Sequence, residues 1–180
     1  EFRRVLFRSA DGVAAFSTTH VLAGAAGGTF ANAPTTDVDL SWNALRDAII
    51  DLEKETKHDS GQLAMSASDL YLLVPPDLEM LADRIVNSTG LPGTDANDRN
   101  SIKSRRNISI VVNPRLTDAD AWFLLAKNKA AHALTFYRRV PISLEPMDKD
   151  PRTKNRIFTV RHRFSVGAWA WQGVFASPGA

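Results

Sequence analysis

The chain has 180 residues, 44% of them hydrophobic and 23% charged, a balance that supplies an ordinary globular core. It contains no cysteine, which excludes disulfides, thiolate metal sites and cysteine nucleophiles, and no apolar run approaches the roughly 18 residues of a membrane-spanning helix. The net charge of +2 is unevenly spread: residues 134–180 contain eight Lys and Arg against three Asp and Glu, whereas residues 10–133 contain 11 against 16. This asymmetry fits a polar partner, self-association between unlike surfaces, or simply a solvated basic sheet face.

The N-terminal third is predicted to contain a leader, a loop and a helix. Residues 1–9, EFRRVLFRS, look like translated cloning-site and adapter sequence and are predicted to be non-native. Residues 10–40 are rich in Ala, Gly and Thr, which predicts a flexible loop or extended arm with a short β-like piece near its start. A helix is predicted over residues 41–57, because apolar residues recur there at spacings of three and four. Its predicted core residues are Trp42, Leu45, Ile49 and Leu52.

The middle of the chain alternates between strand and helix signals. DLYLLVPP, Asp69–Pro76, predicts a buried strand, and the apolar spacing from Leu78 to Val86 predicts a second helix. Residues 91–107 have no periodicity and predict a long loop. Four strands are then predicted, at Ile108–Val112, Ala121–Ala126, Ala133–Val140 and Ile142–Pro146. This order predicts an α+β protein.

The stretch RIFTVRHRFSVGAWAW, residues 156–171, shows strand alternation over its whole length. A strand of 16 residues would span roughly 50 Å, whereas a compact chain of this length is only roughly 40 Å across. Four apolar residues of one row are predicted to lie in the core, namely Phe158, Val160, Phe164 and Val166.

No motif for catalysis or cofactor binding is found in the sequence. GAAGG, residues 24–28, lacks the Lys of a phosphate loop, and neither a zinc-protease motif nor a nucleophile elbow occurs. The four histidines are isolated from one another, and Asp118 and Asp120 fit a turn better than a metal site. The cluster Lys103, Arg105 and Arg106 lacks a surrounding nucleic-acid motif. The sequence therefore predicts no catalytic residue, no metal and no cofactor, and hence no enzyme.

The order of these segments resembles that of a known family. YLLVPPDLEMLADRIV, then ISIVVNPRL with AWFLLA, then a strand pair around MDKDPRTKN, then TVRHRFSVGAWAWQGVF are similar to the C-terminal two-thirds of a tailed-bacteriophage major capsid protein. The resemblance implies the Johnson fold, with a spine helix packed on the long β-strands of a peripheral domain and a mixed α/β axial domain. In such a fold a long strand need not fit one compact body, because neighbouring subunits cover its faces.

The same resemblance implies a domain for each segment. After the leader, residues 10–40 would be the returning half of the E-loop, and residues 41–59 would carry the spine helix of the peripheral domain. The remaining segments would be the axial domain (60–132), the long-stranded sheet with its tip loop (133–165) and a C-terminal return to the axial domain (166–180). Some family members crosslink an E-loop lysine to a neighbour, but residues 10–45 contain no lysine, which argues against that chemistry here.

The implied function is structural, that of a subunit of an icosahedral phage head that self-assembles into pentamers and hexamers and encloses double-stranded DNA. It would be assembled in the bacterial cytoplasm and reside in the virion, with scaffold, portal and decoration proteins as further possible partners and no membrane contact. The tip loop would meet its own copies near three-fold axes through Asp148, Lys149, Asp150, Arg152 and Lys154. Two alternatives stay open: an encapsulin-like compartment shell, and a basic nucleic-acid-binding module, whose affinity would fall steeply with salt.

Overall fold

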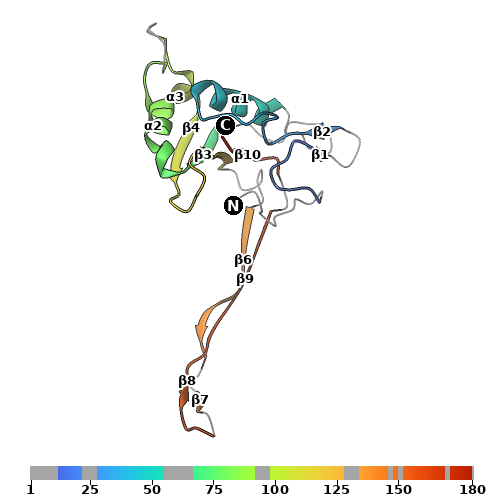
Figure 1. Cartoon of the computed structure of the whole chain (residues 1–180), viewed down its shortest axis with the longest axis vertical. Helices are drawn as coiled ribbons and strands as arrows, with labels where there is room; N and C mark the ends of the chain where they lie inside the picture. The colour runs from blue at the N-terminus through green and yellow to red at the C-terminus, as the bar shows by residue number, and fades with distance from the viewer. Residues whose placement is uncertain are drawn as a thin grey trace. The chain divides into compact units, whose positions relative to one another are not determined.

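The structure is a computed structural model that describes residues 12–21, 28–54, 67–91, 98–127, 134–145, 148–149, 152–168 and 171–179. Its contacts divide the chain into two compact units: unit 1, residues 1–133 with 168–180, and unit 2, residues 134–167 (Figure 1). Both helices and strands are present, with few helices and several sheets, so the mixed α/β composition predicted from the sequence is observed. The capsid domains predicted above are defined by their place in an assembly, and they remain predictions.

Unit 1 is built on a four-stranded mixed sheet in the order β10-β5-β3-β4. Strand β3 (Asp69–Val74) runs parallel to β4 (Asn107–Val112) and antiparallel to β5 (Trp122–Ala126), which in turn pairs antiparallel with β10 (Val174–Ser177). Alternation along β3 gives the sheet two different faces: Leu70, Leu72 and Val74 are fully buried, whereas Tyr71 is exposed. The three predicted strands match β3, β4 and β5 within about two residues, but the sequence analysis did not single out β10.

Helix α1 (Trp42–Lys54) buries its apolar stripe against this sheet. Leu45, Ile49 and Leu52 are buried in one cluster with residues from β3, β5 and β10, and Trp42 packs against that cluster while partly exposed. The helix and its inward face agree with the periodicity. The predicted packing of this helix on the long strands is wrong, because its apolar face is already covered by the unit 1 sheet.

The segment after β3 turns directly into helices. A 3₁₀ turn at Pro76–Leu78 leads into α2 (Glu79–Asn87), which lies beside β4 together with the short helix α3 (Ser101–Arg105) (Figure 1). A loop was predicted where α3 forms. The signal that was missed is Asn100, whose buried side chain accepts a bond from the Ile102 amide at 3.1 Å and donates to the Ile85 carbonyl at 2.8 Å, capping α3 and joining it to α2.

The residues before α1 are tied to the C-terminal strand. Asn32, 2% exposed, donates to the carbonyls of Ala15 and Trp171, and its own carbonyl accepts from the Ala176 amide. The Val38 carbonyl accepts from the Ser177 hydroxyl at 2.8 Å, across 139 residues of sequence. The short strands β1 (His20–Val21) and β2 (Thr29–Phe30) pair antiparallel in the same region. Two ends of the described chain are therefore held together by buried and partly buried polar contacts.

Unit 2 consists of two strand pairs and contains no helix among its described residues. Strand β6 (Leu134–Leu144) pairs with β9 (Val160–Ala168), and β7 (Asp148–Lys149) pairs with β8 (Arg156–Ile157) at one end of them (Figure 1). The predicted strand of 16 residues is thus wrong, because Phe158 and Thr159 interrupt it between β8 and β9. Conversely, β6 joins two predicted strands through Pro141, which is tolerated because a strand of a two-stranded sheet has a free edge. Residues 134–167 are called the arm below.

Candidate functional site

The arm carries a row of large apolar side chains that the single chain leaves exposed. Phe136 and Phe164 stack across β6 and β9 with ring centroids 5.2 Å apart, so the two even-numbered rows lie on the same face. Their exposed fractions are 52% and 57%. Four other large apolar residues in these two rows are also exposed, namely Ile142, Leu144, Val160 and Val166. We call these six residues the apolar face of the arm.

This exposure corrects part of the predicted core. Phe158, Val160, Phe164 and Val166 were expected to be buried, but each is exposed in the single chain. A two-stranded sheet has no second layer of its own to cover an apolar face, and such a pair is at best marginally stable in water. Contiguous exposed apolar side chains of this kind mark protein–protein contact surfaces.

The opposite rows of the arm are mainly polar and basic, although they include the exposed ring of Tyr137. Arg139, Arg161 and Arg163 belong to the odd-numbered rows and are all exposed. One basic residue, Arg138, lies in the even-numbered row beside Phe136. The arm therefore presents an apolar face that includes one arginine and a second face dominated by arginines, which is the chemistry of an interface rather than of a reaction centre.

The predicted tip residues lie around the β7–β8 pair. Its register places Asp148 opposite Ile157 and Lys149 opposite Arg156. Arg152 and Lys154 are exposed in the connecting turn, where Lys154 adopts the left-handed φ of 62°, and Asp150 lies outside the described residues. The structure thus brings four of the five predicted residues to one end of the arm, but a single chain does not test whether copies meet there.

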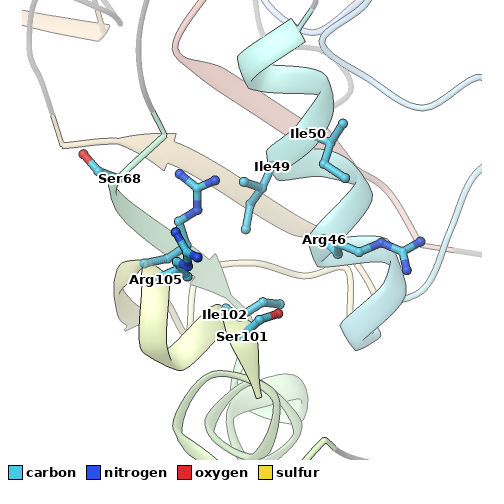
Figure 2. A pocket seen from close by; sticks show the side chains of 8 residues that line it. Arg46, Ile49, Ile50, Ser68, Ser101, Ile102 and Arg105 are labelled. Carbon is cyan, nitrogen blue, oxygen red and sulfur yellow. The ribbon is translucent and has the colours of Figure 1, made fainter. Parts of the chain in front are cut away.

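Unit 1 contains a basic pocket with a cavity volume of about 500 Å³ between α1, α3 and the start of β3. Figure 2 shows Ile49 of α1 pointing toward Ile102 of α3, with the Arg46 side chain extending away from both. The residues lining the pocket are Arg46, Ile49, Ile50, Ser68, Ser101, Ile102, Arg105 and Arg106. No carboxylate, histidine or lysine lines it, so the pocket has neither a general base nor a nucleophile paired with one.

Two of the three pocket arginines are already engaged. Arg46 forms an ion pair with Asp47 at 2.7 Å and lies over the Trp42 ring. Arg106 donates to both carboxylate oxygens of Glu53 at 2.6 and 3.0 Å and to the Ala67 carbonyl. Burial raises the pKa of Glu53, but the bonds from Arg106 and the Ala67 amide outweigh it and hold that pKa below its usual 4.5. Arg106 is therefore a structural residue, and the pocket is a weak basis for function.

The described part of the chain also lacks a metal site and a membrane-spanning helix, and its buried histidine, His20, is structural. No group of three His, Asp or Glu side chains there is arranged to hold a metal ion. His20 is fully buried, stacks on Trp171 at 4.4 Å and approaches the Asn32 side-chain oxygen at 3.1 Å, which is the environment of a structural histidine. No helix among the described residues is long and apolar enough to cross a membrane.

Comparison with known proteins gives the family. A family model described as phage capsid protein matches residues 3–177. The chain belongs to the phage capsid protein family. The match includes residues 3–9 of the predicted leader, and the family resemblance seen in the sequence is confirmed. No curated protein matches this family member. Among solved structures, a virus-like particle from Pyrococcus furiosus is similar, with a TM-score of 0.38 and 16% identity over 79% of this chain and 57% of that one.

Membership of a capsid family accounts for the type of site found. A capsid protein is a structural component of a virion. The sequence analysis named the tip loop as a subunit contact, which stays a prediction, and the row of β9 as core. It did not single out Phe136, Ile142 and Leu144, which are exposed in the structure. Alternation through ALTFYRRV and ISLEP was the available signal, and it does not say whether the chain itself or another copy covers the row.

Proposed function

We propose that this phage capsid protein is a structural subunit of an icosahedral, tailed-phage head of the Johnson fold, which self-assembles and encloses double-stranded DNA. The observation that carries the proposal is the apolar face of the arm, because six large side chains exposed on a two-stranded sheet need a covering surface. In a shell, that surface is supplied by neighbouring subunits. Residues 60–132 would belong to the axial domain and the arm to the peripheral domain.

The tip of the arm is proposed to contact its own copies near three-fold axes. Acidic and basic residues alternate around β7, so three copies could pair opposite charges about an axis. Each exposed pair contributes only about 0–1 kcal/mol, but a closed shell repeats the contact at every such axis.

The test is assembly of the full-length protein that contains this chain, with and without Phe136→Ser and Phe164→Ser. We expect closed particles from the wild type by electron microscopy, and folded but unassembled subunits from the double variant by sedimentation and circular dichroism. Particles of normal yield from the double variant would refute the role of the apolar face.

A compartment shell of the encapsulin type is the second candidate. It shares a self-assembling shell but encloses cargo proteins, so nuclease-treated particles would lack protected DNA. The absorbance ratio of purified particles at 260 and 280 nm separates the two. The third candidate, a basic nucleic-acid-binding module, would bind DNA as an unassembled chain, with affinity falling steeply as salt is raised.

A further inference from the structure

The arm has a strong excess of positive charge that the remainder of the chain could balance. Residues 134–167 contain eight Lys and Arg against three Asp and Glu, whereas the remaining residues contain 14 against 17. Two arms brought together repel each other, while an arm approaching an acidic surface is attracted and held in a preferred orientation. Arg138 is the one arginine in the apolar row, so the surface that covers the apolar face should be apolar and should carry an acidic group that can reach Arg138.

Most acidic surfaces of unit 1 are already neutralised or bonded. Asp47 on α1 is paired with Arg46, and Asp37 and Asp39, which flank the exposed Val38, each have a partner. The basic pocket is unsuitable because its arginines carry the same sign as the arm. The turn with Asp118 and Asp120 has no strongly exposed large apolar side chain beside it among the described residues.

Helix α2 differs from these surfaces. Asp77, in the 3₁₀ turn before α2, and Glu79 and Asp83 on the helix are exposed, and the first two form no ion pair within the part of the chain that the structure describes. Arg84 on α2 is exposed beside them, so these four groups carry a net charge of −2. Asp83 bonds only to the uncharged amide of Asn87, at 2.7 Å. The helix dipole accounts for Glu79 in the first turn of α2 and for Asp77 just before the helix, but Asp83 lies beyond its reach.

The second observation on α2 is Met80, which is 78% exposed among these carboxylates. No other large hydrophobic residue described in the structure is exposed to this extent. A methionine side chain is flexible and polarisable, and it suits a surface that packs against another protein. Figure 1 places α2 at the periphery of unit 1, with β4 on its inner side, so no helix or strand among the described residues of that unit covers its outer face.

We propose that the outer face of α2, centred on Met80, is the surface of a second copy on which the apolar face of the arm docks. Met80 packs against the apolar row, and the carboxylates of α2 attract Arg138, which lies in that same row. This assignment rests on the proposed self-assembly and names its partner surface.

The absence of native cysteine makes disulfide trapping a direct test. A Met80→Cys protein is mixed with an Ile142→Cys protein, both full length, and oxidised under assembly conditions; Ser143→Cys, the next residue on the opposite face of β6, replaces Ile142→Cys in the control. We expect a cross-linked heterodimer on a non-reducing gel, about tenfold above the control because docking raises the effective thiol concentration. A yield no greater than the Ser143→Cys control overturns the docking.

A charge exchange tests the same contact independently. Arg138→Glu in the arm-bearing copy should lower the cross-linking yield, and Asp83→Arg in the Met80→Cys copy should restore it, whereas Arg139→Glu on the opposite face should have little effect. Equal effects of Arg138→Glu and Arg139→Glu contradict the assignment.

Electron microscopy of the same samples separates this inference from the proposed function. Normal particles without the cross-link refute α2 as the partner and leave the shell function intact. The cross-link without closed particles supports the docking and refutes the shell.

Discussion

Arg106 and Glu53 form a bidentate ion pair, with nitrogen–oxygen distances of 2.6 and 3.0 Å. The pair joins the last turn of α1 to the residue before β4. The same arginine donates to the Ala67 carbonyl, and Glu53 accepts from the Ala67 amide at 3.0 Å. The pair thus fastens three segments that are far apart in sequence. Its side chains are only 24% and 28% exposed, so water screens it less than a surface pair.

The first prediction concerns this pair. Glu53→Gln should lower the free energy of unfolding by about 1–3 kcal/mol, because it leaves a half-buried guanidinium without its counter-charge. Asp47→Asn, which removes the exposed Arg46–Asp47 pair, is the control and should change stability by less than about 1 kcal/mol. Urea denaturation measures both, and equal losses would contradict the structural role of Arg106.

The second prediction uses two carboxyl groups of α1 whose pKa values shift in opposite directions. Burial, and then repulsion by Asp47, raises the pKa of Asp51 above 3.8, so the native state binds this proton more tightly than the unfolded chain does. Its stabilising contribution is present at low pH and is lost as pH rises through the raised pKa. Asp51→Asn should therefore raise the Tm at pH 7 and leave it nearly unchanged at pH 3.

Glu53 should behave in the reverse manner. Its lowered pKa contributes stability above pH 4.5 that is lost as pH falls through the native pKa, so Glu53→Gln should flatten the acid limb of a stability–pH curve. Calorimetric Tm values between pH 3 and 7 for both variants give the comparison. An acid limb as steep in Glu53→Gln as in the wild type would exclude this carboxyl as its cause.

The third prediction compares two isoleucines in different environments. Ile49 is 4% exposed in the α1 cluster, whereas Ile142 on the arm is 73% exposed. Ile49→Ala should cost about 2–5 kcal/mol of folding free energy, and Ile142→Ala less than about 0.5 kcal/mol. In the full-length protein, Ile142→Ala should reduce the yield of particles even though the subunit folds stably. A large folding defect in Ile142→Ala would place this residue inside the core.

The fourth prediction concerns the tip of the arm. Replacing Arg152 and Lys154 by Glu in the full-length protein should leave the subunit folded, because both side chains are exposed. Assembly should weaken, and more so at low salt, where like charges repel over a longer distance. Circular dichroism of the subunit and sedimentation of the product are the measurements. Normal particles from this variant at low salt would contradict the assignment of the tip to the three-fold contact.

The helices and strands of unit 1 were largely predictable from the sequence, but which of them pack or pair with one another was not. The spacing of Leu45, Ile49 and Leu52 requires that one side of α1 be buried, but local periodicity does not reveal which sheet buries it. That sheet is completed by β10, whose pairing with β5 depends on contacts distant in sequence. The helix was therefore placed correctly and packed on the wrong strands.

The arm shows a different limit. Alternation at Phe158, Val160 and Phe164 indicates an apolar row, and it predicts burial only if the covering surface belongs to the same chain. The exposed row was therefore mistaken for core. Met80 gave no signal in advance, because one apolar residue outside a helical stripe is common on protein surfaces.

The bond between Val38 and Ser177 sets an order of events during synthesis. A ribosome makes the arm before it makes β10, so the apolar face leaves the exit tunnel while unit 1 still lacks an edge strand and the partner of its N-terminal segment. Closing contacts across 139 residues is slow, and it cannot begin until Ser177 has emerged. The apolar face of the arm and the completed sheet of unit 1 therefore become available at different times during synthesis.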